Sequence, residues 1–302
     1  MSAGDFLAGM AASSRVRADA ARAALPEAEL RARIGDLPAA PRLQLSAAGF
    51  DLIAEMKLRS PAVGALRSAS EEDPAARACL YADAGAAAVS VLTEPSRFDG
   101  ALAHLERAAS ALATSGVPAM RKDFLVDPYQ VLEARAAGAG GVLLILRMLP
   151  RTALERLLDT ALEQGLFVLL EAFDDADVEA AVSMLEPRRA AVGPAGARLL
   201  LGINCRDLVS LQVVPGRLEA MADRLPTWIP RVAESGLATP ADAARLAACG
   251  YDLALVGSAL MTGGAPRDLA GAMLAAARDA LGHRPRRART SADPGVRPAG
   301  RG

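Results

Sequence analysis

Cysteine is scarce in this chain, and its spacing excludes two kinds of site. The three cysteines, Cys79, Cys205 and Cys249, lie far apart and include no CxxC pair. They support neither a zinc site nor a disulfide framework, and we interpret them as small buried side chains.

Histidine is scarcer still, since only His104 and His283 occur. The first lies in a helical pattern and the second in a polar stretch near the end, so neither is placed for acid–base work. Two histidines also argue against a His-ligated metal and a Ser/His/Asp triad. No metal is therefore expected, and lysine and carboxylate side chains must carry any proton transfer.

Long apolar runs and an excess of one charge are missing as well. No run approaches the roughly 18 residues that span a bilayer, and no basic flank precedes an apolar stretch at the start. The net charge of the 302 residues is −1, with 52% apolar residues. We therefore expect a cytoplasmic enzyme with a sizeable core and neither a membrane nor a nucleic-acid partner.

Short apolar runs, each followed by a helical pattern, recur along most of the sequence. They lie at residues 51–56, 87–92, 117–121, 141–146, 166–170, 198–203, 229–233 and 252–256. Eight strand-then-helix units in about 250 residues are typical of a (β/α)8 barrel. The sequence thus predicts an α/β fold, a single TIM barrel over residues 49–282.

Two segments flank this predicted barrel, and one interrupts it. Residues 1–48, rich in alanine and arginine, predict an N-terminal helical extension. Residues 283–302, rich in glycine, proline and arginine, predict a disordered basic tail. The stretch 186–196 precedes the sixth strand and is expected to be a surface loop.

The first predicted strand ends in a charged pair. Glu55 and Lys57 lie two residues apart, so their side chains project together from the carboxyl end of the strand. Burying an acid and an ammonium is costly. The pair therefore indicates chemistry, with a structural ion pair as the alternative.

Polar residues follow other predicted strands too, at the end where such barrels hold their catalytic groups. They include Ser90, Lys122, Glu171, Asn204, Arg206 and Glu234. After the last two strands, Ser235-Gly236 and Gly257-Ser258 supply small residues and backbone N–H groups. Strands seven and eight of these barrels often hold a phosphate this way, so we expect a phosphorylated small-molecule substrate.

Several segments resemble the indole-3-glycerol phosphate synthase family, in the same order and at similar spacings. They are Ile53-Ala54-Glu55-Met56-Lys57, Ser60-Pro61, Ser90-Val91-Leu92-Thr93-Glu94, Phe98-Asp99-Gly100, Arg121-Lys122-Asp123-Phe124, Gly202-Ile203-Asn204, Arg206-Asp207-Leu208 and Ala233-Glu234-Ser235-Gly236. The likeness covers residues 5–280. It implies a carbon–carbon lyase of tryptophan biosynthesis, which converts 1-(2-carboxyphenylamino)-1-deoxyribulose 5-phosphate to indole-3-glycerol phosphate with loss of carbon dioxide and water.

The resemblance also implies roles for individual residues, in an enzyme without cofactor or metal. Lys122 would protonate the ketone oxygen as negative charge builds there. Glu55 would hold that lysine, Lys57 would assist proton transfer, and Glu171 would act in the dehydration.

The implied binding residues surround these groups. Arg206 would attract the benzoate carboxylate, while Asn204 and Glu234 would hydrogen-bond the ribulose hydroxyls. The phosphate would be held by Lys57, Ser235, Gly236, Gly257 and Ser258. Ser90 would line the pocket, and Phe98, Phe124 and Leu144 would form an apolar slot for the aromatic ring.

Departures from the family pattern leave alternatives open. Phe173 stands where the family commonly has histidine, and Cys205 follows Asn204. One alternative is a divergent paralogue that takes a substituted anthranilate-derived substrate. Another is a phosphoribosylanthranilate-type isomerase, for which Cys205 lacks an aspartate partner. The third is a barrel that binds a phosphorylated metabolite without catalysis. By family likeness we expect a monomer.

Overall fold

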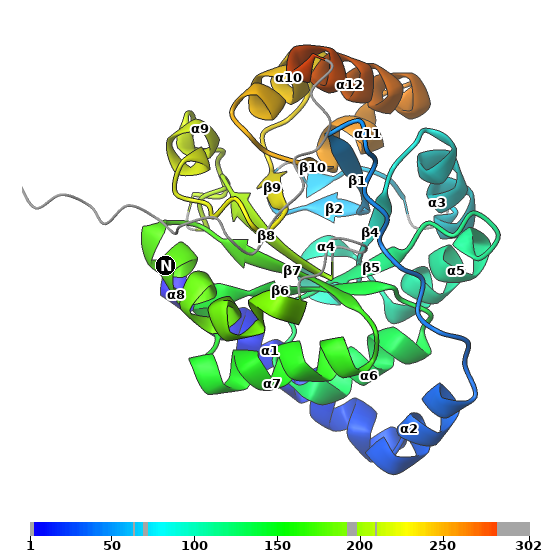
Figure 1. The fold of residues 1–302 in the computed structure, drawn as a ribbon. Helices are drawn as coiled ribbons and strands as arrows, with labels where there is room; N and C mark the ends of the chain where they lie inside the picture. The colour runs from blue at the N-terminus through cyan, green and yellow to red at the C-terminus, as the bar shows by residue number, and fades with distance from the viewer. Residues whose placement is uncertain (1–2, 63, 69–71, 192–197, 209, 283–302) are drawn as a thin grey trace, which may run out of the picture.

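The computed structural model describes residues 3–62, 64–68, 72–191, 198–208 and 210–282. Eight parallel strands close into a barrel surrounded by helices, as the sequence predicts (Figure 1). The strands are β1 (Asp51–Met56), β4 (Ala88–Leu92), β5 (Ala119–Lys122), β6 (Gly141–Ile145), β7 (Phe167–Ala172), β8 (Leu199–Asn204), β9 (Arg231–Glu234) and β10 (Leu253–Val256). Each begins and ends within two residues of its predicted bounds.

The longer helices follow the strands and cover the barrel. They are α3 (Pro74–Asp83), α5 (Leu102–Leu112), α6 (Pro128–Ala136), α7 (Arg151–Glu163), α8 (Asp175–Leu185), α9 (Arg217–Ala222), α10 (Pro240–Ala248) and α12 (Pro266–Leu281). Local sequence sets where they begin. Asp127 caps α6 by accepting a hydrogen bond from the Tyr129 N–H, and Gln130 completes a capping box. The start of α6 is therefore fixed by residues that lie just beyond β5.

Two helices precede the barrel, α1 (Ala3–Ala24) and α2 (Glu27–Gly35). Helix α2 packs on α6, and α1 contacts both α6 and a short 3₁₀ helix, η1 (Leu146–Met148). Figure 1 shows both in blue on the side of the barrel that α6 covers. The N-terminal segment thus lies against the helix that follows β5. Within the described residues, no helix is long and apolar enough to cross a membrane.

Several short elements follow the strands and were not predicted. The hairpin of β2 (Arg59–Ser60) and β3 (Gly64–Ala65) follows β1, helix α4 (Pro95–Phe98) follows β4, and α11 (Ser258–Thr262) follows β10. The stretch expected to be a surface loop begins instead with a 3₁₀ helix, η2 (Glu186–Ala191). The remainder of that stretch and the predicted tail at 283–302 lie outside the described residues.

Strand residues alternate between two apolar clusters. One fills the barrel and includes Ile53, Met120 and Leu143. The other lies between the strands and the surrounding helices and includes Leu52 and Leu144. Side chains of successive strand residues point to opposite faces, so each strand contributes to both. Charged side chains at inward-facing positions near the strand ends therefore converge above the inner cluster.

Candidate active site

A cavity of about 480 Å³ opens at the carboxyl ends of the strands, within the size range of small-ligand pockets. Most of the residues predicted from the sequence lie in its wall. They are Glu55, Lys57, Phe98, Lys122, Phe124, Glu171, Asn204, Arg206, Glu234, Ser235, Gly236 and Ser258. The barrel thus brings together side chains from nearly every strand end.

Both lysines of the chain lie in this cavity. Among 34 basic residues only Lys57 and Lys122 are lysines, and the others are arginines. Lysine titrates where arginine stays charged, so lysine is the basic residue suited to proton transfer. The rarity of lysine was therefore a second signal in the sequence for this site, independent of the motifs.

Glu55 and Lys57 form an ion pair at the end of β1. Lys57 Nζ lies 2.6 Å from Glu55 Oε1, and Glu55 is only 3% exposed. Burial opposes ionisation of Glu55, but the neighbouring Lys57 and Lys122 outweigh it and lower the pKa of the carboxyl below its usual value. Glu55 is therefore a carboxylate shared between two ammonium groups.

Lys122 lies between two acids. Its Nζ is 2.9 Å from Glu171 Oε2 and 3.5 Å from Glu234 Oε2. Burial disfavours the ammonium, yet Glu171, Glu234 and Glu55 outweigh that effect and raise the pKa of Lys122 above its usual value. Lys122 is thus protonated at neutral pH and can donate a proton into the cavity.

The pKa of Glu234 is shifted in the opposite direction from that of Glu55. Glu234 is 1% exposed, and burial together with the charge of Glu171 raises its pKa well above the usual range, while Lys122 opposes this only in part. A protonated carboxyl can donate as well as accept a hydrogen bond. Space for it comes from Gly202, where a Cβ would collide with Glu234 Oε1.

Asn204 ends β8, and Arg206 lies two residues beyond it. Asn204 Oδ1 accepts a hydrogen bond from the Arg206 N–H at 2.9 Å, and Arg206 Nη1 donates to the Leu211 carbonyl at 2.6 Å. These contacts fold the following segment back over the strand end. The guanidinium carries five N–H donors, so it can also bind a carboxylate in the cavity.

The small residues predicted to hold a phosphate follow the paired strands β9 and β10. Ser235 and Gly236 have φ angles of 70° and 76° and turn the chain sharply into the cavity wall. Ser258 also lines the cavity, and Gly257 lies beside the ion pair. A Cβ at position 257 would lie 2.8 Å from Lys57 Nζ and collide with Glu55 Oε1.

An aromatic group forms another part of the wall. The ring centroid of Phe124 lies 6.3 Å from that of Phe98 and 6.0 Å from that of Phe6, the latter in an edge-to-face arrangement. Phe6 comes from α1 and was not predicted. No local pattern at the start of the chain could have placed it beside residues more than ninety positions later.

Besides Gly257, two predicted pocket residues do not line the cavity. Leu144 is 1% exposed and belongs to the cluster between strands and helices, so the prediction that it lines the slot is wrong. Its neighbours Leu143 and Ile145 line the cavity instead, because alternate strand residues face the barrel interior. Ser90 faces inward but is fully buried beneath Leu92, which does line the cavity.

The arrangement can therefore protonate a carbonyl oxygen beside an apolar slot, with anion-binding groups at hand. Within the described ranges, no group of three or more His, Cys, Asp and Glu residues could hold a metal ion.

Comparisons with known proteins agree with this geometry. A family model described as indole-3-glycerol phosphate synthase matches residues 11–270. A protein of that name from Parafrankia sp. (strain EAN1pec) is 44% identical over 223 residues, covering 74% of this chain and 77% of that protein. Another, from Nocardioides sp. (strain ATCC BAA-499 / JS614), is 44% identical over 241 residues, covering 79% and 86%.

Solved structures share the fold at much lower identity. The crystal structure of 3-hexulose-6-phosphate synthase from Salmonella typhimurium superposes with a TM-score of 0.56 at 15% identity, covering 76% of this chain and 99% of that one. This likeness is one of fold alone.

Proposed function

The chain belongs to the indole-3-glycerol phosphate synthase family, and we propose that it forms indole-3-glycerol phosphate for tryptophan biosynthesis. The substrate would be 1-(2-carboxyphenylamino)-1-deoxyribulose 5-phosphate, which loses carbon dioxide and water as the ring closes. The observation that carries the proposal is the Lys122 ammonium between Glu171 and Glu234, at the wall of a cavity with an apolar slot.

The cavity suggests how the substrate is oriented. Phe98 and Phe124 would hold the anthranilate ring, and Arg206 would bind its carboxylate. Ser235, Ser258 and the neighbouring glycines would hold the phosphate together with Lys57. Such a placement would stretch the substrate across the barrel mouth and leave its ketone near Lys122.

Ring closure would begin with proton donation from Lys122. The ring carbon that bears the carboxylate attacks the ketone carbon, and the carbonyl electron pair moves to oxygen, which takes the proton of the ammonium. The bond to the carboxylate then breaks, its electron pair restores the aromatic ring, and carbon dioxide leaves. Lys122 is now a neutral amine, and Glu171, 2.9 Å from its Nζ, is placed to pass it the proton that Glu171 takes up in the dehydration step.

Dehydration would follow at the same site. The nitrogen lone pair expels the new hydroxyl group, which takes a proton from solvent and leaves as water, and a base then removes the proton on the adjacent carbon to give the indole. Glu171 is our candidate for this proton transfer. Asn204 and Glu234 would hydrogen-bond the hydroxyls of the chain that becomes the glycerol phosphate.

The isomerase alternative is disfavoured by the position of Cys205. Its side chain is 2% exposed and lies outside the cavity wall, with Sγ 3.3 Å from the Ser235 carbonyl. Burial raises the pKa of the thiol and so disfavours the reactive thiolate. We also propose that the protein is a monomer in the cytoplasm. Sedimentation would test whether it is a monomer.

The test mixes the purified chain, treated with a metal chelator, with the substrate and follows indole fluorescence. We expect product to appear without added cofactor. A folded protein that binds the substrate but gives no indole would contradict the proposed reaction. Ring-substituted substrates measured alongside would support the specialised alternative only if they turned over much faster than the unsubstituted one.

A further inference from the structure

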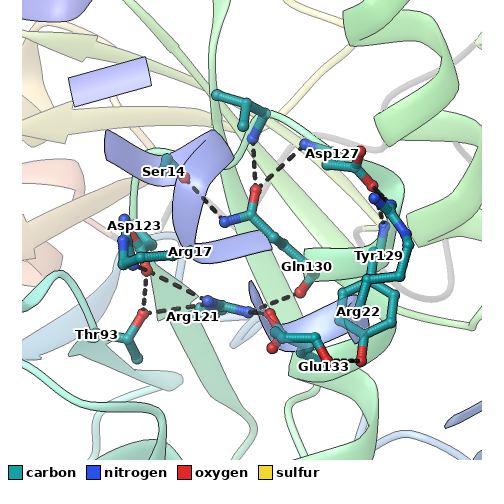
Figure 2. A network of polar contacts seen from close by, with 12 residues as sticks. Ser14, Arg17, Arg22, Thr93, Arg121, Asp123, Asp127, Tyr129, Gln130 and Glu133 are labelled. Atoms are coloured by element: carbon teal, nitrogen blue, oxygen red, sulfur yellow. Dashed lines mark hydrogen bonds and ion pairs between the residues drawn. The ribbon is translucent and has the colours of Figure 1, made fainter. Parts of the chain in front are cut away.

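Arg17 of α1 contacts the end of the strand that carries Lys122. Its Nη1 donates to Asp123 Oδ2 at 3.0 Å and its Nη2 to Asp123 Oδ1 at 2.9 Å, across 106 residues of sequence (Figure 2). Such a bidentate pair fixes both the distance and the orientation of the two groups. Asp123 directly follows Lys122, so the N-terminal helix touches the chain next to the candidate acid.

Asp123 is the centre of a buried polar network. It is 2% exposed and also accepts hydrogen bonds from Thr93 Oγ1 at 2.7 Å, from the Phe124 N–H at 2.8 Å and from Arg121 Nη2 at 3.3 Å. Burial alone would favour the neutral acid, but Arg17 and Arg121 hold the pKa of Asp123 at about 2. The carboxylate is therefore charged, and removal of Arg17 would leave it under-compensated.

The same network holds the backbone of Lys122. The Thr93 N–H donates to the Lys122 carbonyl at 3.1 Å, while the Thr93 hydroxyl donates to Asp123. On the other side of Lys122, Arg121 Nη1 donates to the Gln130 carbonyl at 2.8 Å and so joins the strand end to α6. The strand end is thus fixed by contacts that meet at Asp123, whereas the ammonium is held by Glu171.

We propose that Arg17 is a positioning residue for Lys122: by pairing with Asp123 it fixes the end of β5 and thereby the place of the Lys122 ammonium in the cavity. The proposal rests on the acid role proposed for Lys122. Helix α1 would then do more than pack on the barrel, because it would also fix the position of the proposed acid.

Other contacts also attach α1 to the barrel, and a residue in one of them can serve as a matched control for Arg17. Arg22 pairs with Asp127, and Ser14 accepts a hydrogen bond from Gln130 Nε2 at 2.9 Å (Figure 2). The Tyr129 hydroxyl donates to the Leu25 carbonyl at 2.7 Å. These contacts join α1 and its end to the start of α6 and involve no residue of β5.

The first experiment compares Arg17→Met with Arg22→Met. Each removes one arginine of the same helix, Arg17 with its ion pair to Asp123 and Arg22 with its ion pairs to Asp19 and Asp127. Only the first touches Asp123. We expect kcat to fall by about 10-fold to 100-fold in Arg17→Met, more than KM rises, because the acid is displaced by a fraction of an ångström. Arg22→Met should keep kcat within about twofold. Millimolar guanidinium should restore part of kcat to Arg17→Ala.

The second measurement needs no turnover. Because the chain has only two lysines, growth on ¹³Cε-lysine gives an NMR spectrum with two lysine signals, which Lys122→Met assigns. Arg17→Met should move the Lys122 signal more than that of Lys57, and Arg22→Met should leave both in place. If Arg17→Met does not fold, Arg17→Lys replaces it, and its spectrum then contains a third lysine signal, from position 17, beside those of Lys57 and Lys122. That variant keeps the charge without the bidentate geometry, and we expect an intermediate kcat.

Equal kcat values and equal spectra for the Arg17 and Arg22 variants would overturn the positioning role. If the wild-type protein is active and depends on Lys122 in that case, the proposed function stands and only this inference fails. If the folded wild-type protein gives no product, the proposed function fails and the inference fails with it.

Discussion

Gly257→Ala tests whether the Glu55–Lys57 pair must occupy its observed position. The added Cβ would lie 2.8 Å from Lys57 Nζ and would also collide with Glu55 Oε1. Both atoms are ends of flexible side chains, so they can move away. The φ angle at position 257 is −120°, outside the left-handed region that favours glycine. The substitution should therefore disturb the site more than the fold.

The size of the effect follows from the contact distances. Ordinary van der Waals contact with a Cβ begins at 3.4 Å, so both charged atoms must retreat by about half an ångström or more. Misplacement by about 1 Å can cost 10²-fold in rate. We expect kcat/KM to fall by about 10-fold to 100-fold, equivalent to about 1.4 to 2.7 kcal/mol of transition-state stabilisation. The free energy of unfolding should change by less than about 1 kcal/mol.

The assay is indole fluorescence for kcat/KM and urea unfolding for stability. Gly264→Ala is the control, since a Cβ there meets nothing within 4 Å. It should match the wild-type protein in both assays. If Gly257→Ala keeps the wild-type kcat/KM, the position of the Glu55–Lys57 pair has no influence on the reaction and the prediction is wrong.

Three further predictions concern other residues of the site. Glu171→Gln should release carbon dioxide at near the wild-type rate but form indole slowly, so rapid-quench samples should contain a decarboxylated intermediate; its absence would remove Glu171 from the dehydration step. The folded-state pKa of Asp123, about 2, lies below the value of 3.8 for a free side chain, so its stabilising contribution of about 2 kcal/mol is present above pH 4 and is lost as the pH falls toward 2. Urea titrations should show that the free energy of unfolding falls less between pH 4 and pH 2 in Asp123→Asn than in the wild-type protein. Equal decreases in the two proteins would contradict the assignment. Leu143→Ala should raise KM because Leu143 lines the cavity, whereas Leu144→Ala should lower the free energy of unfolding by about 2 to 5 kcal/mol with little change in KM; the reverse pattern would restore Leu144 to the slot.

The barrel was predictable because it repeats. Each strand is a short apolar run with buried faces on both sides, and each is followed by a helical pattern, so eight local signals support one another. The ends of β1 and β5 were predictable for a related reason. Charged residues such as Glu55 and Lys122 interrupt or end apolar runs at positions where a barrel gathers its functional groups.

Two kinds of feature were not predictable: which face of a strand a given residue occupies, and contacts between residues far apart in the sequence. Leu144 was chosen over Leu143 because both are apolar, and a one-residue error exchanges the two faces of a strand. Phe6 and Arg17 reach the site only through the packing of α1 against the barrel. The need for glycine at position 257 follows from the nearby ends of two side chains, which no local pattern encodes.

The central claim is that Lys122 protonates the ketone during formation of the carbon–carbon bond. The most direct test is a single-turnover experiment with Lys122→Met and a substrate labelled in its carboxylate, in which carbon dioxide and indole are measured together. Because decarboxylation follows ring closure, we expect the release of carbon dioxide and the formation of indole to slow together by about 10²-fold or more. Release of carbon dioxide at the wild-type rate, with or without slower indole formation, would contradict it.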